Sequence, residues 1–275
     1  MPKKVKLAPA FEEALKFCRP YVVAPKDHLR FLDLKPLGVE VTGNLQIDPT
    51  RLDSQRFLTW IERLDAQTFG PQAMAMPRWV FYDCAEWPSA LFGLAARPED
   101  LSLSLRERFE VAPRDKVWVP LSLHVAIPTV KPGEFFEHNV GSLGSEAGLK
   151  GLGTFTKALG VRLLKAQSLV GAAQWGSRAL GMHQRFGPLE LLTVFTPAHS
   201  YPRSLTYRHD CSLETLSRVV SGEAAPTLDA THRVKTDDAS LIALQRKLER
   251  GKTAVLAGPL FEKAQGLYAP IRVQG

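Results

Sequence analysis

Residues 135–164 read FFEHNVGSLGSEAGLKGLGTFTKALGVRLL, and this stretch decides the fold of the chain. Over Phe135–Leu143 the side chains alternate well enough to predict a β-strand. Glycines dominate the residues that follow, and Thr154–Leu164 then carries apolar side chains at helical spacing. The stretch therefore predicts a strand, a glycine-rich turn and a helix in direct succession.

Strands and helices alternate around this stretch as well. The apolar, β-branched run Val117–Ile127 predicts a buried strand just before it. After it the sequence predicts a strand at Ser168–Gln174, a short helix at Ser177–Phe186 capped by Ser177, and strands at Leu189–Phe195 and Ser204–Tyr207. Such alternation favours an α/β (α+β) domain with a mixed central sheet and helices packed on it.

The remaining segments show weaker patterns. Before residue 117 we expect a helix at Asp53–Leu64 and strands at Gly38–Ile47, Met76–Tyr82 and Ser89–Ala95. Residues 212–275 are less regular, with one clear helix at Asp238–Arg250. We therefore expect one α/β domain over residues 1–211 and a smaller C-terminal extension over residues 212–275.

The composition is that of a globular protein, with 275 residues of which 45% are hydrophobic and 23% charged. The longest apolar runs fall short of the roughly 20 residues that a bilayer crossing needs. The basic N-terminus is not followed by the apolar core of a signal peptide. We therefore expect a cytoplasmic protein with no membrane partner.

The three cysteines form no Cys-x-x-Cys pair, which predicts reduced thiols and no metal site.

The net charge of +7 is concentrated in one part of the chain. Residues 147–211 hold eight Lys and Arg but only two Asp and Glu, a balance of +6. A basic cleft attracts polyanions, so nucleic acid and a phosphorylated cofactor are both candidate ligands. A solvated surface with no partner explains the same charge equally well.

The glycine-rich turn Gly148-Leu149-Lys150-Gly151-Leu152-Gly153 lies where a strand meets a helix. Backbone amides at such a turn can approach an anion, and the start of the helix adds its positive end. A dinucleotide fingerprint needs an acidic residue about 20 positions further on, and the first acid here is Glu190. A Walker loop would end in Gly-Lys-Ser or Gly-Lys-Thr, which is absent.

This segment resembles the acyl-CoA-binding core of the GNAT superfamily of N-acyltransferases, over roughly residues 79–209. Gly151 and Gly153 match the small positions of that family's Arg/Gln-x-x-Gly-x-Gly/Ala pattern, whereas Gly148 replaces the Arg or Gln. The resemblance implies a mixed central sheet with helices on both faces. It also implies acyl transfer from acetyl-CoA or another acyl-CoA to an amine acceptor that the sequence does not identify.

The family's next helix has an Ala-x-x-x-Tyr-x-x-x-Gly-like register, which Ala179, His183 and Gly187 occupy here. His183 thus stands where a Tyr often protonates the departing thiolate, and we expect it to be the general acid. Gly176 replaces an Asn that is often found three residues before the Ala. With two pattern residues changed, a nucleic-acid-binding or partner-binding protein with a degenerate, non-catalytic fold of this type is the alternative.

The resemblance also implies the other site residues. The backbone that would hold the cofactor pyrophosphate belongs to Leu149, Lys150, Gly151, Leu152, Gly153 and Thr154. A carboxylate on or near the preceding strand often serves as the base in this family, and Glu137 is our candidate for that role. Glu134, His138 and Glu86 are further candidates for the proton acceptor.

Overall fold

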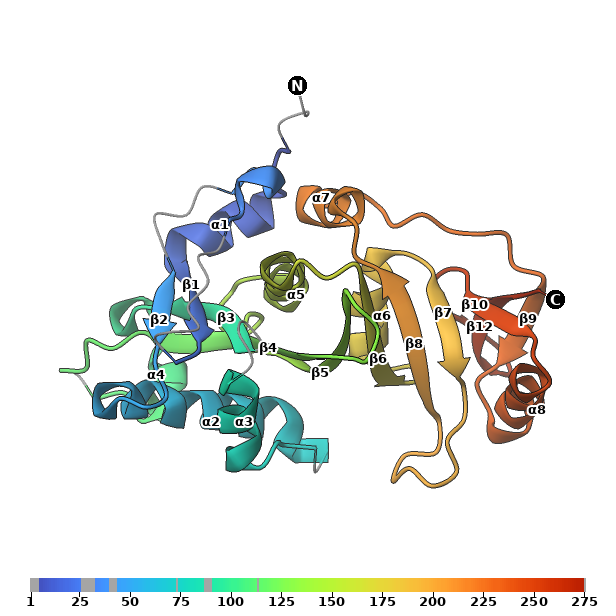
Figure 1. Ribbon diagram of the computed structural model, residues 1–275, viewed down its shortest axis with the longest axis horizontal. Helices are drawn as coiled ribbons and strands as arrows, with labels where there is room; N and C mark the ends of the chain where they lie inside the picture. The colour runs from blue at the N-terminus through green and yellow to red at the C-terminus, as the bar shows by residue number, and fades with distance from the viewer. Residues whose placement is uncertain are drawn as a thin grey trace. The chain divides into compact units, whose positions relative to one another are not determined.

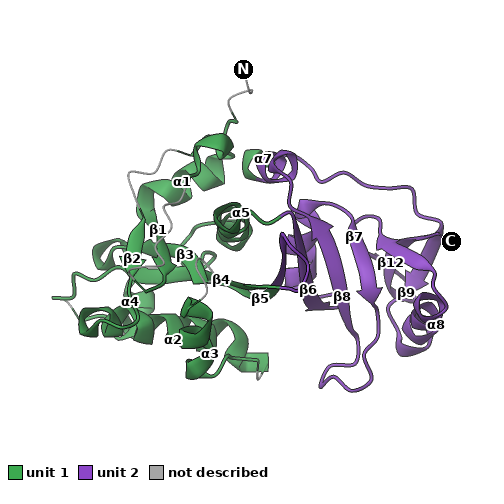
Figure 2. Ribbon diagram, viewed as in Figure 1, with its two compact units in different colours: residues 1–128, 137–166, 220–222 green, residues 129–136, 167–219, 223–275 purple. Residues whose placement is uncertain are grey.

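The computed structural model describes residues 5–25, 33–39, 44–72, 74–86, 91–112 and 114–274. These residues form two compact units (Figure 2). Unit 1 comprises residues 1–128, 137–166 and 220–222, and unit 2 comprises residues 129–136, 167–219 and 223–275. Within the described residues, no helix combines the length and the apolar character that a membrane span requires.

Unit 1 is built on a mixed sheet whose strands run in the order β5-β4-β3-β1-β2. Their bounds are β1 Cys18–Val23, β2 Leu45–Ile47, β3 Leu91–Ala96, β4 Val119–Pro128 and β5 Glu134–Ser142. The sheet is mixed because β1 pairs parallel with β2 but antiparallel with β3, which is in turn antiparallel to β4. β5 begins in unit 2 and enters unit 1 at Glu137.

Helices cover both faces of this sheet (Figure 1). They are α1 Pro9–Phe17, α2 Gln55–Phe69, α3 Arg78–Glu86, α4 Leu103–Phe109 and α5 Leu152–Leu164. α5 packs on β3 and β4 from one side, and α2 packs on β4 from the other. α5 is buried on nearly all sides because α1 covers its outer surface, where the ring of Phe11 stacks on that of Phe155 at 4.6 Å.

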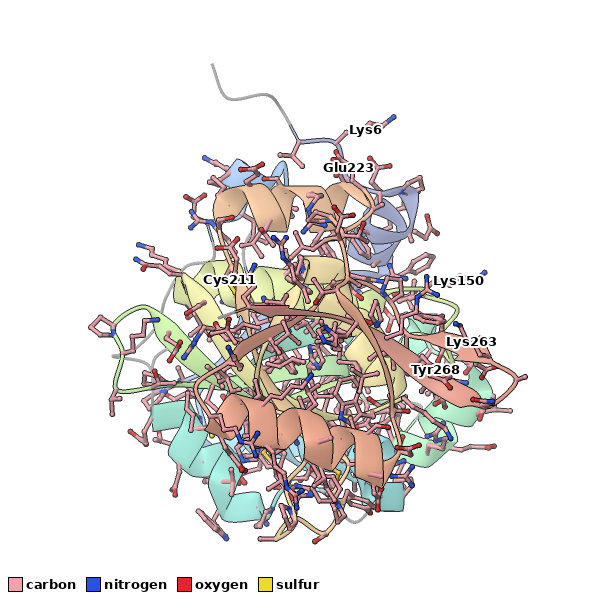
Figure 3. The ribbon with its side chains drawn as sticks, turned by 90° about the vertical axis from the view of Figure 1, so that its right-hand side faces the viewer. Lys6, Lys150, Cys211, Glu223, Lys263 and Tyr268 are labelled. Atoms are coloured by element: carbon pink, nitrogen blue, oxygen red, sulfur yellow. The ribbon has the colours of Figure 1, made fainter. Side chains whose placement is uncertain are left out.

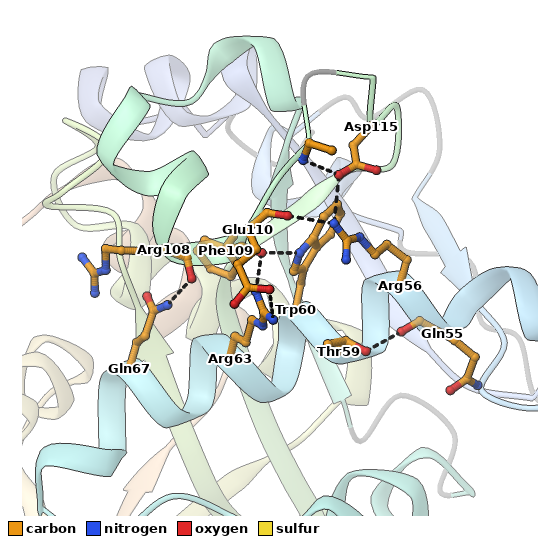
Figure 4. Close-up of polar contacts among 11 residues, drawn as sticks. Gln55, Arg56, Thr59, Trp60, Arg63, Gln67, Arg108, Phe109, Glu110 and Asp115 are labelled. Atoms are coloured by element: carbon orange, nitrogen blue, oxygen red, sulfur yellow. Dashed lines mark hydrogen bonds and ion pairs between the residues drawn. The ribbon is translucent and has the colours of Figure 1, made fainter.

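α2 is fixed to the end of α4 by donors that reach exposed helix carbonyls (Figure 4). Trp60 Nε1 and Arg63 Nη1 both donate to the carbonyl oxygen of Phe109, at 2.8 and 2.7 Å. Arg56 Nη2 donates to the carbonyl of Glu110, which ends α4 in the left-handed conformation. The last carbonyls of a helix lack intrahelical partners, so these bonds satisfy them and hold α2 in place.

Unit 2 contains an antiparallel sheet in the order β11-β12-β10-β7-β8-β6, with β9 paired to β12. Its strands are β6 Ser168–Gln174, β7 Leu189–Thr193, β8 Ser204–Asp210, β9 His232–Lys235, β10 Thr253–Leu256, β11 Phe261–Lys263 and β12 Gly266–Gln274. Its helices are α6 Arg178–His183, α7 Leu213–Ser221 and α8 Asp238–Glu249, and α7 ends within the part assigned to unit 1.

The C-terminal residues continue the sheet rather than forming a separate body within unit 2. β10 pairs with β7 through Ala254, Val255 and Leu256. One apolar core contains residues from both sides of position 211, including Leu191 of β7 and Ile271 of β12. Burial of shared apolar surface therefore joins the last strands to the preceding ones.

The mixed α/β fold predicted from the sequence is confirmed, and every element predicted from residue 117 to 207 is present in order. Ser177 caps α6 by accepting a hydrogen bond from the amide of Leu180. The strand predicted at Met76–Tyr82 is wrong, because α3 occupies Arg78–Glu86. The buried side chains of α3 are Phe81, Cys84 and Ala85, which follow helical spacing.

The strand predicted at Gly38–Ile47 is also only partly correct. A 3₁₀ turn at Lys35–Leu37 ends at Gly38 in the left-handed conformation, and β2 covers Leu45–Ile47. Residues 40–43 lie outside the described residues, as do residues 87–90, which include the start of the strand predicted at Ser89–Ala95. The rest of that predicted strand is β3.

Candidate functional site

The glycine-rich turn joins β5 to α5 within unit 1, and its own backbone holds its shape. The amides of Glu146 and Ala147 both donate to the carbonyl oxygen of Leu143. The amide of Leu149 closes a second loop onto the carbonyl of Gly144 at 2.6 Å. These backbone hydrogen bonds define the shape of the turn.

Two glycines of the turn adopt backbone conformations that favour glycine. Gly148 and Gly151 both have φ of 76°, in the left-handed region. Gly148 occupies the position where the resemblance implies Arg or Gln. Its left-handed backbone, which residues with side chains rarely adopt, is a physical reason for a glycine at this position. A side chain on Gly151 would also meet the ring of Phe11 at 3.1 Å.

The first turn of α5 leaves its amides available to an anion. Gly151 is the N-cap, no side chain caps the helix, and no acidic residue lies in its first turn. The Phe155 amide makes the first intrahelical bond, to the carbonyl of Gly151, so the amides of residues 152–154 have no carbonyl partner within the helix. Lys150 is exposed beside them and points outward (Figure 3). Amides and a cation in this arrangement suit phosphate oxygens.

A cavity of about 140 Å³ lies against the same turn in unit 1. Gly148 and Leu149 line it together with Phe17 of α1, and so do two acidic residues, Glu13 and Asp100. Two carboxylates disfavour a phosphate group. The cavity is therefore distinct in chemistry from the start of α5.

Glu137, the predicted base, lies in a buried ion pair. Its Oε2 accepts a hydrogen bond from Lys157 Nζ at 2.9 Å, and its Oε1 lies 3.1 Å from His124 Nε2. Lys157 is fully buried, and Glu137 is 5% exposed. The contact with Lys157 places the Glu137 side chain on the sheet face that α5 covers. Its catalytic role stays a prediction.

The side chains of β5 change faces between Glu137 and Asn139. Residues two apart on a regular strand point to the same face. Glu137 nevertheless contacts Lys157 of α5, whereas Asn139 contacts Asp65 of α2 on the opposite face. The alternation is thus interrupted at His138, as in a β-bulge, and irregularities of this kind are frequent next to active sites.

Asp65 is a buried carboxylate on α2 that faces β5. It is 1% exposed, and its two oxygens accept from the Met76 amide at 2.6 Å and from Asn139 Nδ2 at 2.9 Å. Burial raises the pKa of Asp65, although these two hydrogen bonds and the nearby His138 oppose the rise. Asn139 Oδ1 in turn lies 3.3 Å from His138 Nδ1. A buried acid, an amide and an exposed imidazole are therefore linked in sequence.

His183, the predicted acid, belongs to unit 2 and is the last residue of α6. It is 2% exposed, and its ring centroid lies 4.9 Å from that of Tyr207. Its role also stays a prediction. The predicted cofactor-binding residues 149–154, in contrast, all lie together in unit 1.

The other candidates raised by the sequence lie in different surroundings. Glu134 accepts a hydrogen bond from Arg208 Nε at 2.6 Å within unit 2. Glu86 is exposed at the end of α3.

Burial, together with the charge of Asp100, raises the pKa of the Cys18 thiol to about 12, so this thiol stays protonated near neutral pH. Among the residues that the structure describes, no group of acids, His and Cys could hold a metal ion.

Ion pairs with carboxylates of the same protein neutralise part of the positive charge of the basic segment 147–211. Within the part of the chain that the structure describes, at least four of its eight cations contact carboxylates, namely Lys157, Arg162, Arg203 and Arg208. Their partners Glu137, Asp33, Asp238 and Glu134 come from outside the segment, and Arg208 also contacts Glu190 within it. The excess of +6 in sequence is therefore a smaller excess on the surface, which weakens the case for nucleic acid.

Known proteins were compared with the chain at the levels of sequence and structure. No protein-family model and no curated protein sequence matches it. The chain is similar to solved N-acyltransferase structures. One is a chain of the NatC complex bound to Gag peptide and CoA, with 12% identity, 60% of this chain and 96% of that chain covered, and a TM-score of 0.44.

The other is the ribosomal-protein-alanine N-acetyltransferase of Escherichia coli, with 11% identity, 59% of this chain and 90% of that chain covered, and a TM-score of 0.34.

Sequence reasoning missed Asp65 as a site residue. The helical spacing of α2 nevertheless indicates that Asp65 is buried, because it lies beside Leu64 on the apolar face that Phe57, Leu58 and Ile61 define. A charged side chain on the buried face of a helix is rare unless it is paired. The identity of its partner, Asn139, depends on how the helix packs on the sheet.

Proposed function

We propose that the chain is an acyl-CoA-dependent N-acyltransferase that transfers an acyl group from acetyl-CoA or another acyl-CoA to an amine. The observation that carries this proposal is the start of α5. A strand, a rigid glycine-rich turn and a helix with an uncapped, acid-free first turn follow one another there. This arrangement suits the phosphates of CoA, and the order of elements from β4 to β8 is the order that the resemblance implies.

Within this proposal the backbone amides of residues 152–154 and the Lys150 ammonium hold the phosphates. The exposed part of Lys150 supplies a mobile positive charge, while the amides supply fixed donors. His183 remains the predicted acid, and Glu137 is the base that the sequence resemblance implies. The 1–211 segment would be the acyltransferase domain and 212–275 its extension.

Calorimetric titration with acetyl-CoA tests the proposal. Loss of one charge-assisted hydrogen bond costs roughly 1.5–3 kcal/mol, so Lys150→Gln should raise the Kd by at least about tenfold. Lys165→Gln is the matched control, because Lys165 is exposed at the opposite end of α5. Its Kd should equal that of the wild type.

Absence of binding heat with the wild-type protein at millimolar acetyl-CoA would overturn the proposal. Gly151→Glu would be a poor test, because the left-handed backbone and the contact with Phe11 predict strain whether or not CoA binds.

A further inference from the structure

We propose that His138 is the proton acceptor for the incoming amine and that Asn139 and Asp65 fix the tautomer of its imidazole ring. His138 would be the catalytic residue, and the other two would be positioning residues. The inference rests on the proposed acyl transfer and names the base for it. The three side chains lie in unit 1 and come from β5 and α2.

Asp65 sets the orientation of the Asn139 amide. An ionised carboxylate can only accept hydrogen bonds. Asp65 Oδ1 therefore takes the Asn139 Nδ2 hydrogen at 2.9 Å, while Oδ2 takes that of the Met76 amide at 2.6 Å. With its NH₂ group turned toward Asp65, Asn139 must direct its carbonyl oxygen away from it.

The Asn139 carbonyl oxygen then sets the tautomer of His138. Asn139 Oδ1 lies 3.3 Å from His138 Nδ1, and an amide oxygen cannot donate. Nδ1 must therefore carry the hydrogen of this contact. In the neutral imidazole, the lone pair that can accept a proton is consequently on Nε2.

The strand presents His138 and Glu137 to different surroundings. The Glu137 carboxylate is buried against Lys157 beneath α5. His138 is exposed and lies at the interruption of the strand alternation, four residues before β5 ends at Ser142. A base must reach its substrate, and exposure favours His138 over Glu137 for that contact.

The reaction balances with this assignment. The neutral amine nitrogen attacks the thioester carbonyl carbon, so that a C–N bond forms and the C–S bond breaks. The surplus proton on nitrogen passes to His138 Nε2. The CoA thiolate leaves with the electron pair of the C–S bond and takes up a proton, and His138 later returns its own proton to solvent.

The tautomer is measured directly by ¹⁵N chemical shifts of the histidine rings, in the full-length protein at a pH where the rings are neutral. His138 should carry its hydrogen on Nδ1. His199 is an internal control of the opposite kind, because its Nδ1 accepts from the Tyr201 amide at 2.9 Å and its hydrogen must be on Nε2. An Nε2–H tautomer for His138 in the wild type would overturn the relay.

Variants separate the relay from a general structural effect. Asn139→Ala and Asp65→Asn should each shift His138 toward the Nε2–H tautomer. Gln67→Ala, on the same helix and hydrogen-bonded to the Arg108 carbonyl away from β5, should leave the tautomer unchanged. If Asn139→Ala does not fold, Asp65→Asn decides, and an unchanged tautomer in a folded relay variant contradicts the proposal.

Chemical labelling places His138 in or outside the acyl-transfer site without knowledge of the acceptor. Diethyl pyrocarbonate acylates accessible neutral imidazoles, and mass spectrometry should find it on His138 and on the exposed His199. Saturating acetyl-CoA should slow the labelling of His138 at least about tenfold and leave that of His199 unchanged. Calorimetric binding of acetyl-CoA without protection of His138 would overturn the base assignment alone.

If acetyl-CoA produces no binding heat, the proposed acyltransferase function fails, and the catalytic role of His138 fails with it. The tautomer measurement distinguishes that case, since an Nδ1–H ring would still show the Asp65–Asn139–His138 relay to exist.

Discussion

Lys157 Nζ donates a hydrogen bond to Glu137 Oε2 at 2.9 Å, and this buried ion pair ties α5 to β5. The other carboxylate oxygen of Glu137 lies 3.1 Å from His124 Nε2 on the neighbouring strand. All three side chains are buried. One carboxylate therefore links the helix and two strands beside the glycine-rich turn.

Replacement of Lys157 by Met should destabilise the protein by about 3–5 kcal/mol, because it leaves the Glu137 charge buried beside a methylene chain. Urea unfolding measures the loss. The double variant Lys157→Met with Glu137→Gln should recover a large part of it, since no charge then remains unpaired. If the single Lys157 variant is as stable as the wild type, the pair does not hold the helix.

Gly160 and Gly181, each in the interior of a helix, should respond oppositely to alanine. A Cβ on Gly160 of α5 would overlap the His124 ring, whereas one on Gly181 of α6 meets nothing within 4 Å. Gly160→Ala should cost about 1–3 kcal/mol. Gly181→Ala should add roughly 0.5–1 kcal/mol, because the unfolded chain loses freedom. Equal melting temperatures for the two variants would contradict the packing of α5 on His124.

Glu134 should contribute to stability in a pH-dependent way. Burial disfavours its charge, but hydrogen bonds from Arg208 and Thr129 and the charges of Arg208 and Lys131 outweigh burial and lower its pKa. A lowered carboxyl pKa stabilises the folded state above the ordinary pKa of the group, and this stability is lost as the pH falls through the lowered value.

Glu134→Gln should therefore be about 1–3 kcal/mol less stable than the wild type at pH 7. Unfolding curves should show the gap close as the pH approaches and passes below the native pKa of Glu134. A gap of constant size across that range would show that the carboxylate charge is not responsible.

His183 should affect turnover without affecting cofactor binding. General acid catalysis contributes roughly 10²–10⁴-fold, so His183→Gln should slow CoA-thiol release about 100-fold while the Kd for acetyl-CoA stays near that of the wild type. Because His183 is buried against Tyr207, the melting temperature is the required control. Normal turnover in a folded variant would exclude His183 as the acid.

The candidate site shows how far sequence patterns reach. The turn, its glycines and the start of α5 follow from residues within about 20 positions of one another, and the local pattern predicted them together. Glu137, His138 and Glu134 were all recognised as candidates for the proton acceptor. The pattern could not rank them, because exposure and ion pairing depend on Lys157, Arg208 and other residues from different elements.

The sequence by itself determined the order and type of the elements from β4 to β8, because strand alternation, helical spacing and the Ser177 cap are properties of neighbouring residues. Only the tertiary structure brought Asp65 to Asn139, across 74 positions of the chain. It also turned Glu137 beneath α5 and left His138 exposed. The placement of these three side chains depends on which faces of the helices and the sheet pack together, and on a local break in strand alternation. Both are fixed when surfaces that are distant in sequence are buried against one another.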